Sequence, residues 1–379
     1  MSIMPGAMLG LLGGGQLGRM FIMAAQSMGY QVTVLDPSRD SPAGHVADRF
    51  LCADFSDKTA LRELGTTCAG VTTEFENIPA DSLSFLAEYC IVSPDADSVA
   101  IAQNRIMEKQ FLVTNGFPVA AFAVIQSGNA VSPDTHPELF PGILKVSRFG
   151  YDGKGQVRVS NKAELDAAFS SMKGESCVFE QLLPLRSEIS VIVARGFDDE
   201  LSVFPVAENR HVQGILDVSI VPASVPREII QQASEATIRV AEKLDYRGIL
   251  CVEFFILADG RLLINEIAPR THNSGHYTID ACMTSQFEQQ VRTLCGLPLG
   301  STKLLSAAVM VNLLGDLWQQ KEPDWKQVLQ HTNTKLHLYG KREARPGRKM
   351  GHYTVLDTTA EAALQQALRI KQLLSENTN

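Results

Sequence analysis

The first hundred residues alternate short apolar runs with segments whose apolar residues recur at helical spacing. Four apolar runs predict strands, at 8–12, 31–36, 50–53 and 70–75. Two segments between them predict helices, at 17–28 and 79–89. Strands that alternate with helices form a parallel sheet, because parallel neighbours need a crossover connection. Residues 1–103 are therefore predicted to form a doubly wound, Rossmann-like domain.

The pattern changes after a helix predicted over 99–115. Residues 104–298 predict α+β structure with mostly antiparallel strands and a lid subdomain at about 117–183. Six strands are expected, at 143–146, 156–159, 177–181, 189–194, 201–206 and 218–221. Two long helices are expected, at 163–172 and 227–244. Residues 299–379 predict a small β-rich domain, with strands at 307–313, 335–339 and 353–356 and a helix at 360–374.

Composition argues against several classes of function. The chain has 34 Lys and Arg against 42 Asp and Glu, so an acidic surface disfavours nucleic acid as a partner. Its seven cysteines include no C-x-x-C pair, which disfavours a zinc site or a disulfide framework. The sequence has neither a membrane-spanning run of ~18 apolar residues nor the charged start of a signal peptide. We expect a cytoplasmic protein with no membrane association.

Three glycines follow the first predicted strand, as Gly13-x-Gly15-x-x-Gly18, and Asp36 ends the second. This spacing fits the dinucleotide fingerprint and would suit an NAD-dependent oxidoreductase. The motif, however, requires only that backbone N–H groups at the start of a helix face an anion. Any phosphate group can be that anion. The glycines also suit close packing of helix on strand. The motif alone leaves all three interpretations open.

The segment 251–270 places two acidic residues inside apolar strands. Asp259-Gly260 favours a two-residue hairpin turn between them. If these two residues alone form the turn, Glu253 lies directly opposite Glu266 on one face of the sheet. Directly opposed Cβ atoms are ~4.5–5.5 Å apart.

Two carboxylates at that distance repel by about 3 kcal/mol at an effective dielectric near 20. A divalent cation would compensate this repulsion, and oxygen ligands favour Mg²⁺. Asn265, next to Glu266, could add a carbonyl ligand. The alternatives are that one glutamate is protonated, or that the register differs and the two do not meet.

A lysine and a glycine-rich segment are typical of a phosphate-binding lid. Lys145 lies in the apolar run 143–146, and GYDGKGQ follows at 150–156. Such a segment can close over a triphosphate, although an ordinary hairpin also fits. The run CVFEQLL at 177–183 could meet an adenine edge near Glu180, and Glu188 could reach a ribose.

Together these features resemble the nucleotide site of ATP-grasp enzymes. Further segments narrow the resemblance to the N5-carboxyaminoimidazole ribonucleotide synthetase family. They are GGGQLGRM at 13–20, TEFENIP at 73–79, NSGHYTIDAC at 273–282, TSQFEQ at 284–289 and RPGRKMGHYTV at 345–355. The resemblance covers essentially the whole chain and implies an ATP-grasp fold.

The resemblance implies a carbon–nitrogen ligase of purine biosynthesis. ATP would phosphorylate bicarbonate to carboxyphosphate, and the exocyclic amine of 5-aminoimidazole ribonucleotide would then be carboxylated. ATP and Mg²⁺ are the implied cofactors, and a homodimer is implied. A formate-using glycinamide ribonucleotide transformylase would share the ATP residues and is the near alternative.

The resemblance also implies roles for individual residues. The ATP site would contain Arg105, Lys145, Gly150, Tyr151, Asp152, Gly153, Lys154, Gly155, Gln156, Glu180, Gln181, Leu182, Leu183, Glu188, His211, Asn265 and Glu266. Asp152, Arg270 and His272 would be catalytic, and Glu253 and Glu266 would bind the metal. The ribonucleotide would contact Gly15, Gln16, Leu17, Glu76, Lys341 and Arg348. Thr271 stands where the family usually has Pro, and it is expected to loosen the aim of its two neighbours.

Five cations lie within the nine residues 341–349. A solvated surface loop is the ordinary interpretation of such a run. Here Pro346-Gly347 favours a tight turn between apolar strands, so we expect an anchored loop. Lys341 and Arg348 are predicted to reach the ribonucleotide phosphate near 13–18, with Arg342, Arg345 and Lys349 more peripheral.

Overall fold

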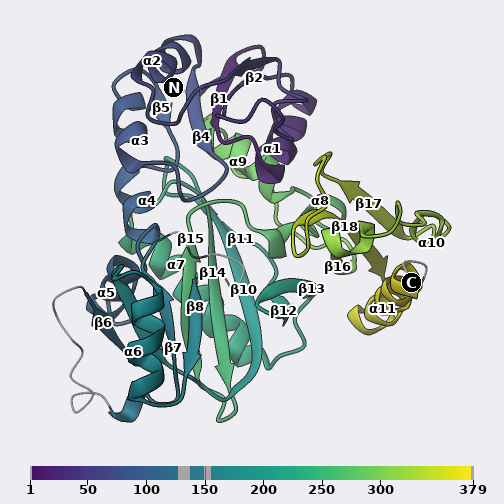
Figure 1. Ribbon diagram of the computed structural model, residues 1–379. Coiled ribbons are helices and arrows are strands. Elements are labelled where there is room, and N and C mark those ends of the chain that lie inside the picture. Colours follow the sequence, from purple (N-terminus) through teal and green to yellow (C-terminus); the bar gives the residue numbers. More distant parts are fainter. Residues whose placement is uncertain (1, 127–136, 149, 151–154, 377–379) are drawn as a thin grey trace.

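The computed structural model describes residues 2–126, 137–148, 150 and 155–376 (Figure 1). The N-terminal part is a five-stranded parallel sheet in the order β3-β2-β1-β4-β5. Its strands are β1 Met8–Leu12, β2 Gln31–Leu35, β3 Arg49–Leu51, β4 Gly70–Thr73 and β5 Ile91–Val92. Its helices are α1 Gln16–Ser27, α2 Lys58–Thr67, α3 Ala80–Leu86 and α4 Ala96–Ala102. The predicted doubly wound sheet is confirmed, and β5 and α2 are additional elements.

The single helix predicted over 99–115 is two helices. The chain leaves helical geometry at Asn104, which has φ −124° and ψ 107°. Its side chain accepts a hydrogen bond from the Ile106 N–H and so caps a new helix, α5 Arg105–Thr114. The break sets the face of α5 independently of α4, and that face carries part of the site described below.

A small antiparallel sheet follows, in the order β6-β9-β7-β8. Its strands are β6 Phe122–Ile125, β7 Gly142–Val146, β8 Gln156–Val159 and β9 Cys177–Gln181. Helix α6 Lys162–Ser171 packs on it, with Leu165 and Ala168 in the same hydrophobic cluster as Leu144 and Phe179. A short 3₁₀ turn, η2 Pro137–Leu139, also joins this unit.

The largest sheet has nine strands and connects the rest of the chain. Its path is β15-β14-β10-β12-β13-β16-β18-β17, with β11 paired to β10. The strands are β10 Leu185–Arg195, β11 Leu201–Val203, β12 Ala207–Val212, β13 Ile215–Val221, β14 Gly248–Leu257, β15 Leu262–Ala268, β16 Ala307–Leu314, β17 Thr334–Leu338 and β18 Lys349–Asp357. Since β16 pairs with β13, the C-terminal region extends this sheet instead of forming one of its own.

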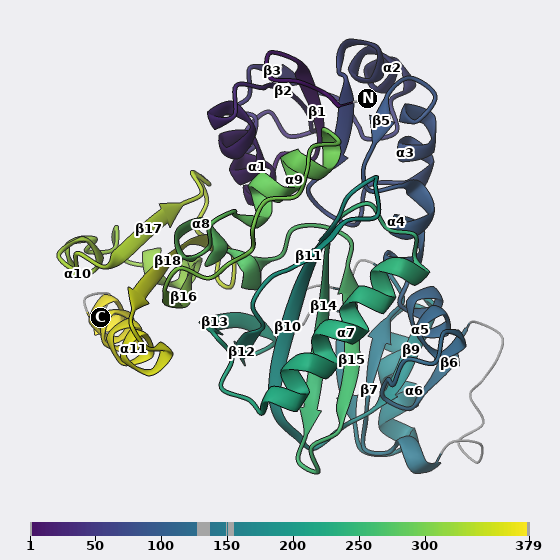
Figure 2. The same cartoon turned by 180° about the vertical axis from the view of Figure 1, so that it is seen from behind.

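Helices cover the large sheet at different places (Figures 1 and 2). Helix α7 Arg227–Lys243 lies across β10, β14 and β15, and its Ala233 and Val240 join a core with Val191, Leu250 and Val252. Helix α9 Gln286–Leu294 packs against α1, and α11 Ala360–Glu376 against β16 and β18. Shorter elements are η3 Asn273–Gly275, α8 Thr278–Ala281, η4 Gly315–Trp318 and α10 Lys326–Leu329.

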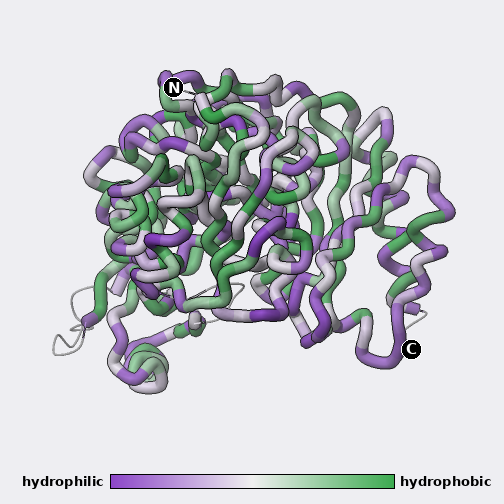
Figure 3. Tube along the Cα trace, turned by 90° about the horizontal axis from the view of Figure 1, so that it is seen from above, coloured by the Kyte–Doolittle hydropathy of each residue, from purple (hydrophilic) through white to green (hydrophobic). Residues whose placement is uncertain are grey.

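Hydropathy follows this packing. In Figure 3 the closing helix α11 alternates hydrophobic and hydrophilic stretches, and its Ala363, Ala367, Ile370 and Leu374 are the buried ones. That spacing places them on one helical face, against the sheet. Among the described helices, none combines the length and the apolar character needed to cross a bilayer.

Candidate active site

The hairpin between β14 and β15 brings Glu253 opposite Glu266, so the predicted pairing is confirmed. The predicted two-residue turn, however, is wrong. The Leu257 N–H donates to the Arg261 carbonyl at 2.9 Å, and the Gly260 N–H donates to the Leu257 carbonyl at 2.9 Å. The loop therefore contains three residues, with Gly260 in the left-handed region at φ 88°.

The longer loop moves the pairing by one residue near the turn, so that Phe254 lies opposite Ile264. A β-bulge between Glu253 and Phe254 then inserts Asn265 as an extra residue and restores the expected register. The two deviations offset each other. The predicted carboxylate pair results from both.

The electrostatics and donor set of this pair fit a divalent cation. Burial and the negative charge of Glu266 raise the pKa of Glu253 to about 7, against the opposing charge of His211. Asn265 Oδ1 is buried and receives no hydrogen bond from the described part of the chain. Two carboxylates and an unpartnered amide oxygen match the all-oxygen preference of Mg²⁺.

The described residues contain no cluster of three or more His, Cys, Asp and Glu side chains that could hold a metal ion. A cation at Glu253 and Glu266 would therefore depend on further oxygens from a ligand. Sites that bind Mg²⁺ through one or two carboxylates typically complete its coordination with substrate phosphates and water.

One face of α5 contacts β15 beside this pair. Arg105 Nη1 lies 3.1 Å from Glu266 Oε2, and Lys109 Nζ donates to the Asn265 carbonyl at 3.0 Å. The Ile267 N–H donates to the carboxylate of Glu108. Burial raises the pKa of Glu108 to about 7 despite the adjacent Arg105 and Lys109.

Glu108 and Lys109 are not among the site residues predicted from the sequence. Their spacing to Arg105 is i+3 and i+4, which puts all three on one helical face and was a usable signal.

Three charges are buried together beneath the β7–β9 sheet. Lys145 Nζ lies 2.8 Å from Glu180 Oε2, and Lys109 Nζ lies 3.5 Å from Glu180 Oε1. Burial raises the pKa of Glu180, but the two ammonium groups outweigh it and hold that pKa at about 2. Burial lowers the pKa of Lys145. The Glu180 side chain is therefore an anion fixed between two lysines.

The backbone after β9 has one amide left for a ligand. The Gln181 N–H donates to the Ala121 carbonyl and the Leu182 N–H to the Pro141 carbonyl, both at 2.9 Å. The Leu183 N–H has no hydrogen-bond partner among the described residues. Of the predicted adenine contacts, Leu183 thus offers the free backbone donor.

Glu188 and His211 lie on the neighbouring strands β10 and β12. The Glu188 Oε2 atom is 3.2 Å from His211 Nδ1. Burial lowers the pKa of His211, but the hydrogen bond and charge of Glu188 raise it further, so that the net shift is upward. Glu188 alternates with Ile189 along β10 and so lies on the same face as Glu253, the partner of Ser190.

Arg270 joins the N-terminal domain to the large sheet. Its Nε donates to the carboxylate of Glu76, and its Nη1 donates to the Thr271 carbonyl at 3.1 Å. Burial would raise the pKa of Glu76, but Arg270 brings it below its usual value. A predicted catalytic residue and a predicted ribonucleotide ligand are thus partners of each other.

The side chain of Gln286 holds the backbone of His272. Gln286 Oε1 accepts the His272 N–H and Gln286 Nε2 donates to the His272 carbonyl, both at 2.8 Å. Its Nε2 lies 3.2 Å from Glu253 Oε1. The Thr271 hydroxyl is buried and makes no hydrogen bond within the described ranges. Gln286 and Glu76 therefore hold His272 and Arg270, and the Thr271 side chain contributes no hydrogen bond to their positions.

The glycine-rich turn already binds carboxylates of the chain itself. The Gly14 N–H donates to Asp36 Oδ2 at 2.7 Å and the Ser38 N–H to Asp36 Oδ1 at 2.7 Å. Glu74 is buried and accepts from the Gly15 and Gly18 N–H groups. Neither the amides nor Asp36 are free for a dinucleotide.

Two of the predicted ribonucleotide contacts start helix α1. Leu17 belongs to the hydrophobic core of the N-terminal domain, so its backbone alone can meet a ligand. Gln16 is half-buried at the first position of the helix. A phosphate bound here would have to compete with Glu74 for the helix start.

The basic loop at 341–349 contacts the N-terminal domain, as Arg342 Nε is 3.0 Å from Asp40 Oδ1. Lys341 Nζ donates to the Lys349 carbonyl at 2.7 Å. That Arg348 reaches the ribonucleotide phosphate, with Lys349 more peripheral, stays a prediction. Arg348 donates to the Glu343 carbonyl in its own loop, whereas Lys349 begins β18 and its charge acts on Glu253, His211 and His272.

The lid is described in part. Tyr151, Asp152, Gly153 and Lys154 lie outside the described residues. Gly155 has φ 71° and its carbonyl accepts the Val146 N–H at 2.9 Å, and Gln156 pairs with Lys145. Gly155 and Gln156 thus anchor one end of the segment to the strand that carries Lys145.

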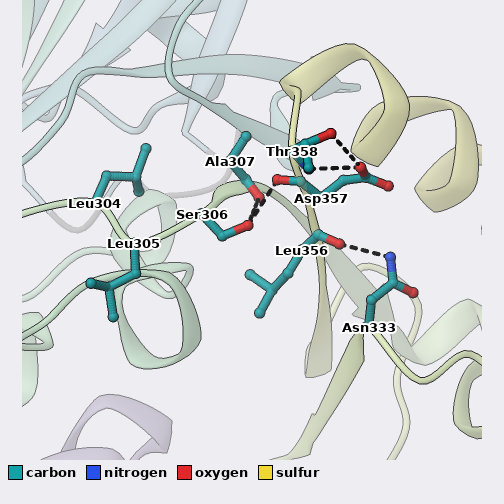
Figure 4. Close-up of a pocket in the computed structure, with 8 residues that line it drawn as sticks. All are labelled: Leu304, Leu305, Ser306, Ala307, Asn333, Leu356, Asp357 and Thr358. Atoms are coloured by element: carbon teal, nitrogen blue, oxygen red, sulfur yellow. Dashed lines mark hydrogen bonds between the residues drawn. The ribbon is translucent and has the colours of Figure 1, made fainter.

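A separate cavity of about 650 Å³ lies where β16 begins and β18 ends (Figure 4). It is lined by Leu304, Leu305, Ser306, Ala307, Asn333, Leu356, Asp357 and Thr358. Ser306 Oγ donates to the Asp357 carbonyl and Asn333 Nδ2 to the Leu356 carbonyl. None of the predicted site residues lines this cavity.

Comparison with known proteins gives matches along the whole chain. Residues 7–103 match the ribonucleotide synthetase preATP-grasp domain, 110–287 the ATP-grasp domain and 308–366 the phosphoribosylaminoimidazole carboxylase C-terminal domain. The N5-carboxyaminoimidazole ribonucleotide synthase of Bacillus subtilis (strain 168) is 43% identical over 364 residues, or 96% of this chain and 95% of that protein.

Solved structures agree. The ADP complex of an N5-carboxyaminoimidazole ribonucleotide synthetase has a TM-score of 0.92 at 42% identity, over 100% of this chain and 99% of that one. The Aspergillus clavatus synthase in complex with ADP and 5-aminoimidazole ribonucleotide has a TM-score of 0.89 at 30% identity, over 98% and 99%. The predicted ATP-grasp fold, with its N-terminal and C-terminal companions, is confirmed.

Proposed function

Since this chain belongs to the N5-carboxyaminoimidazole ribonucleotide synthetase family, we propose how its residues perform the reaction of that family. The protein is an ATP-grasp ligase that carboxylates 5-aminoimidazole ribonucleotide to N5-carboxyaminoimidazole ribonucleotide in purine biosynthesis. The NAD-dependent and formate-using alternatives are set aside by this membership. For this chain we propose the residues of the site, the use of bicarbonate and Mg²⁺, and the oligomeric state.

The ATP site is proposed between the small sheet and the large one. Leu183 offers its N–H to the adenine, and the Glu188–His211 pair offers polar groups to the ribose. Lys145, fixed by Glu180, and Arg105 contact the phosphates. The glycine-rich segment 150–156, of which 151–154 lie outside the described residues, is proposed to supply further contacts to the phosphates.

The observation that carries the assignment is that Glu253 lies opposite Glu266 beside Arg105, with the buried Asn265 Oδ1, unpartnered among the described residues, on the adjacent bulge residue. Glu253, Glu266 and Asn265 would hold Mg²⁺. When bound, Mg²⁺ neutralises charge on the transferring phosphoryl group and orients it. Arg105 holds the Glu266 carboxylate in position, and Lys109 holds the bulge through the Asn265 carbonyl.

The acceptor side is proposed around Arg270, His272 and Asp152. Arg270 and Lys349 supply positive charge for bicarbonate, which ATP converts to carboxyphosphate, and for the carboxylate that forms on the amine. Gly15, Gln16, Leu17, Glu76 and Lys341 surround the ribonucleotide. Arg348, whose Nη1 donates to the Glu343 carbonyl of its own loop, is proposed to reach the ribonucleotide phosphate with its other donors.

The assay that tests this function is ADP release with ATP, Mg²⁺ and bicarbonate, with and without 5-aminoimidazole ribonucleotide. Release should depend on bicarbonate and rise sharply when the ribonucleotide is added. Formate with glycinamide ribonucleotide should have no such effect. The assignment would be overturned if formate with glycinamide ribonucleotide stimulated ADP release and bicarbonate with 5-aminoimidazole ribonucleotide did not.

The affinity of the proposed metal site should depend on pH. Glu253 must lose its proton to bind a cation, and its pKa is raised to about 7. Apparent affinity should therefore fall about tenfold between pH 8 and pH 6, because the acid form dominates below pH 7. Mn²⁺, used as a paramagnetic stand-in without nucleotide, can be followed by electron paramagnetic resonance. Glu253→Gln should bind weakly at both pH values, and an unchanged pH profile in that variant would contradict the prediction.

Arg348 and Arg345 of the basic loop should behave differently. Arg348→Ala should raise the KM for the ribonucleotide roughly tenfold to a hundredfold, because losing one charge-assisted hydrogen bond to the phosphate costs ~1.5–3 kcal/mol. Arg345→Ala is the matched control, since Arg345 pairs with Glu343 at the surface, and it should change that KM by less than about threefold. The KM for ATP should stay within a few-fold in both variants. Equal losses for both substrates, or none for either, would mean that the loop is only a solvated face.

We also propose a cytoplasmic homodimer with three domains, 1–103, 104–298 and 299–379. Family membership supports this, and the pairing of β16 with β13 supports a rigid junction between the last two. Sedimentation equilibrium tests the oligomeric state.

A further inference from the structure

A row of buried polar side chains crosses the large sheet next to Glu253. Ser190 on β10 lies directly opposite Glu253 on β14, and Asn209 on β12 lies opposite Ser219 on β13. These strands are neighbours in the order β14-β10-β12-β13. All three polar residues of the row are at most 5% exposed. Buried polar groups of this kind are retained when every one of them has a partner.

The row is continuously hydrogen-bonded to His272. Ser219 Oγ donates to Asn209 Oδ1 at 2.8 Å, and Asn209 Nδ2 donates to Ser190 Oγ at 2.9 Å. Ser190 Oγ is 2.7 Å from Ser274 Oγ, which is 2.8 Å from His272 Nδ1.

The direction of these bonds follows from the His272 end. The backbone N–H of Ser274 donates to His272 Nδ1 at 3.3 Å, and a backbone amide cannot reverse its polarity. Nδ1 is therefore an acceptor, and the ring proton belongs on Nε2. The Ser274 hydroxyl then gives its one proton to Nδ1, so Ser190 gives its proton to Ser274 and accepts from the Asn209 amide.

We propose that Ser219, Asn209, Ser190 and Ser274 are positioning residues that fix His272 as its Nε2–H tautomer. The protonated nitrogen is the one that lies 3.2 Å from Glu253 Oε1. His272 then acts as a donor that orients a carboxylate, and it is not the base that takes a proton from the amine. This inference rests on the proposed placement of Glu253 and His272 in the active centre.

The tautomer can be measured directly. In the full-length protein with ¹⁵N-labelled histidine, the His272 signals are assigned by their loss in His272→Gln. The ¹⁵N shifts should identify Nδ1 as unprotonated and Nε2 as protonated. Ser274→Ala removes the hydroxyl donor to Nδ1, and Asn209→Asp keeps the shape of the side chain but can only accept from Ser190. In Ser274→Ala the longer, 3.3 Å bond from the backbone N–H alone would hold Nδ1 as an acceptor, so in both variants the population of the Nδ1–H tautomer should rise above that in the unmodified protein.

Turnover supplies the second measurement. Both variants should lower kcat for ribonucleotide-dependent ADP release roughly tenfold, with the KM for ATP within about threefold. Ser202→Ala, on the adjacent strand β11 and outside the row, should leave tautomer and kcat unchanged. A proton on Nδ1 in the unmodified protein overturns the proposal, and so does a variant that shifts the tautomer at full turnover. Failure of the unmodified protein to turn over would contradict the proposed function but leave the tautomer result intact.

Discussion

Glu266→Gln is expected to lower the rate of ribonucleotide-dependent ADP release by about a thousandfold while the protein remains folded. The substitution keeps the size of the side chain and removes one of the two proposed ionic ligands of Mg²⁺. A metal ion contributes several kcal/mol to a phosphoryl-transfer transition state, and about 4 kcal/mol corresponds to a thousandfold in rate. It also removes the partner of Arg105, which lies 3.1 Å away.

Glu208→Gln is the matched control. Glu208 is a partly buried glutamate of the same sheet, but it pairs with Ile189 and so lies on the face opposite to Glu188 and Glu253. Its turnover should stay within about threefold of the unmodified protein. Circular dichroism should be unchanged in both variants. If Glu266→Gln retains full turnover when Mg²⁺ is limiting, the pair does not bind the metal.

The success of the carboxylate prediction depended on two deviations that no local pattern announced. The three-residue loop moves the register by one, and a one-residue shift turns each side chain to the other face. With the loop alone, Glu266 would point away from Glu253. The bulge at Asn265 corrects this, and it is held by Lys109 from α5, a contact between residues 156 positions apart. Only tertiary structure supplies such a contact.

Local patterns were reliable where the signal lies within one element. Strands β1, β7, β9 and β16, and helices α6, α7 and α11, appear within a residue or two of the predicted bounds. Local patterns failed where a short polar residue sets the boundary of a helix. Asn104 is such a residue, since it caps the new helix α5. Local patterns also could not pair Arg270 with Glu76, because those residues come from different sheets.

The polar row shows a further limit. Ser190 lies between the apolar Ile189 and Val191, which predicts only the face that it occupies, whereas Asn209 lies between two charged residues and gives no such pattern. Their function in the structure comes from the strand order β14-β10-β12-β13, which places β14 next to a strand some sixty residues earlier in the chain. Sequence spacing carries no information about that order.

Glu180→Gln is expected to destabilise the protein by about 3–5 kcal/mol, the cost of breaking a buried ion pair by removing one partner. Lys109 and Lys145 both lie beside this carboxylate, and their side chains are 1% and 10% exposed. Without the anion, two buried ammonium groups would lie near each other with no carboxylate between them. Their repulsion and desolvation would be relieved only by local opening or by loss of a proton.

The pH dependence of stability gives an independent check on the same group. The pKa of Glu180 is lowered to about 2 in the folded state, from an ordinary value of 4.5. A lowered folded pKa means that its contribution is fully present above pH 4.5 and is lost as the pH falls towards 2. Glu180→Gln should remove this component of acid sensitivity and leave the components from other carboxylates.

Glu63→Gln provides the comparison. Glu63 pairs with Arg49 on the surface, where the two side chains are 41% and 46% exposed, and an exposed pair contributes less than about 1 kcal/mol. Urea-induced unfolding gives the free energies, and hydrogen exchange of residues 177–181 reports the local effect at β9. Equal losses of unfolding free energy in the two variants would mean that the Glu180 ion pairs stabilise the protein no more than the exposed Glu63 pair does. A loss confined to Glu180→Gln would show that the ion pair with Lys145 stabilises the protein before any ligand binds.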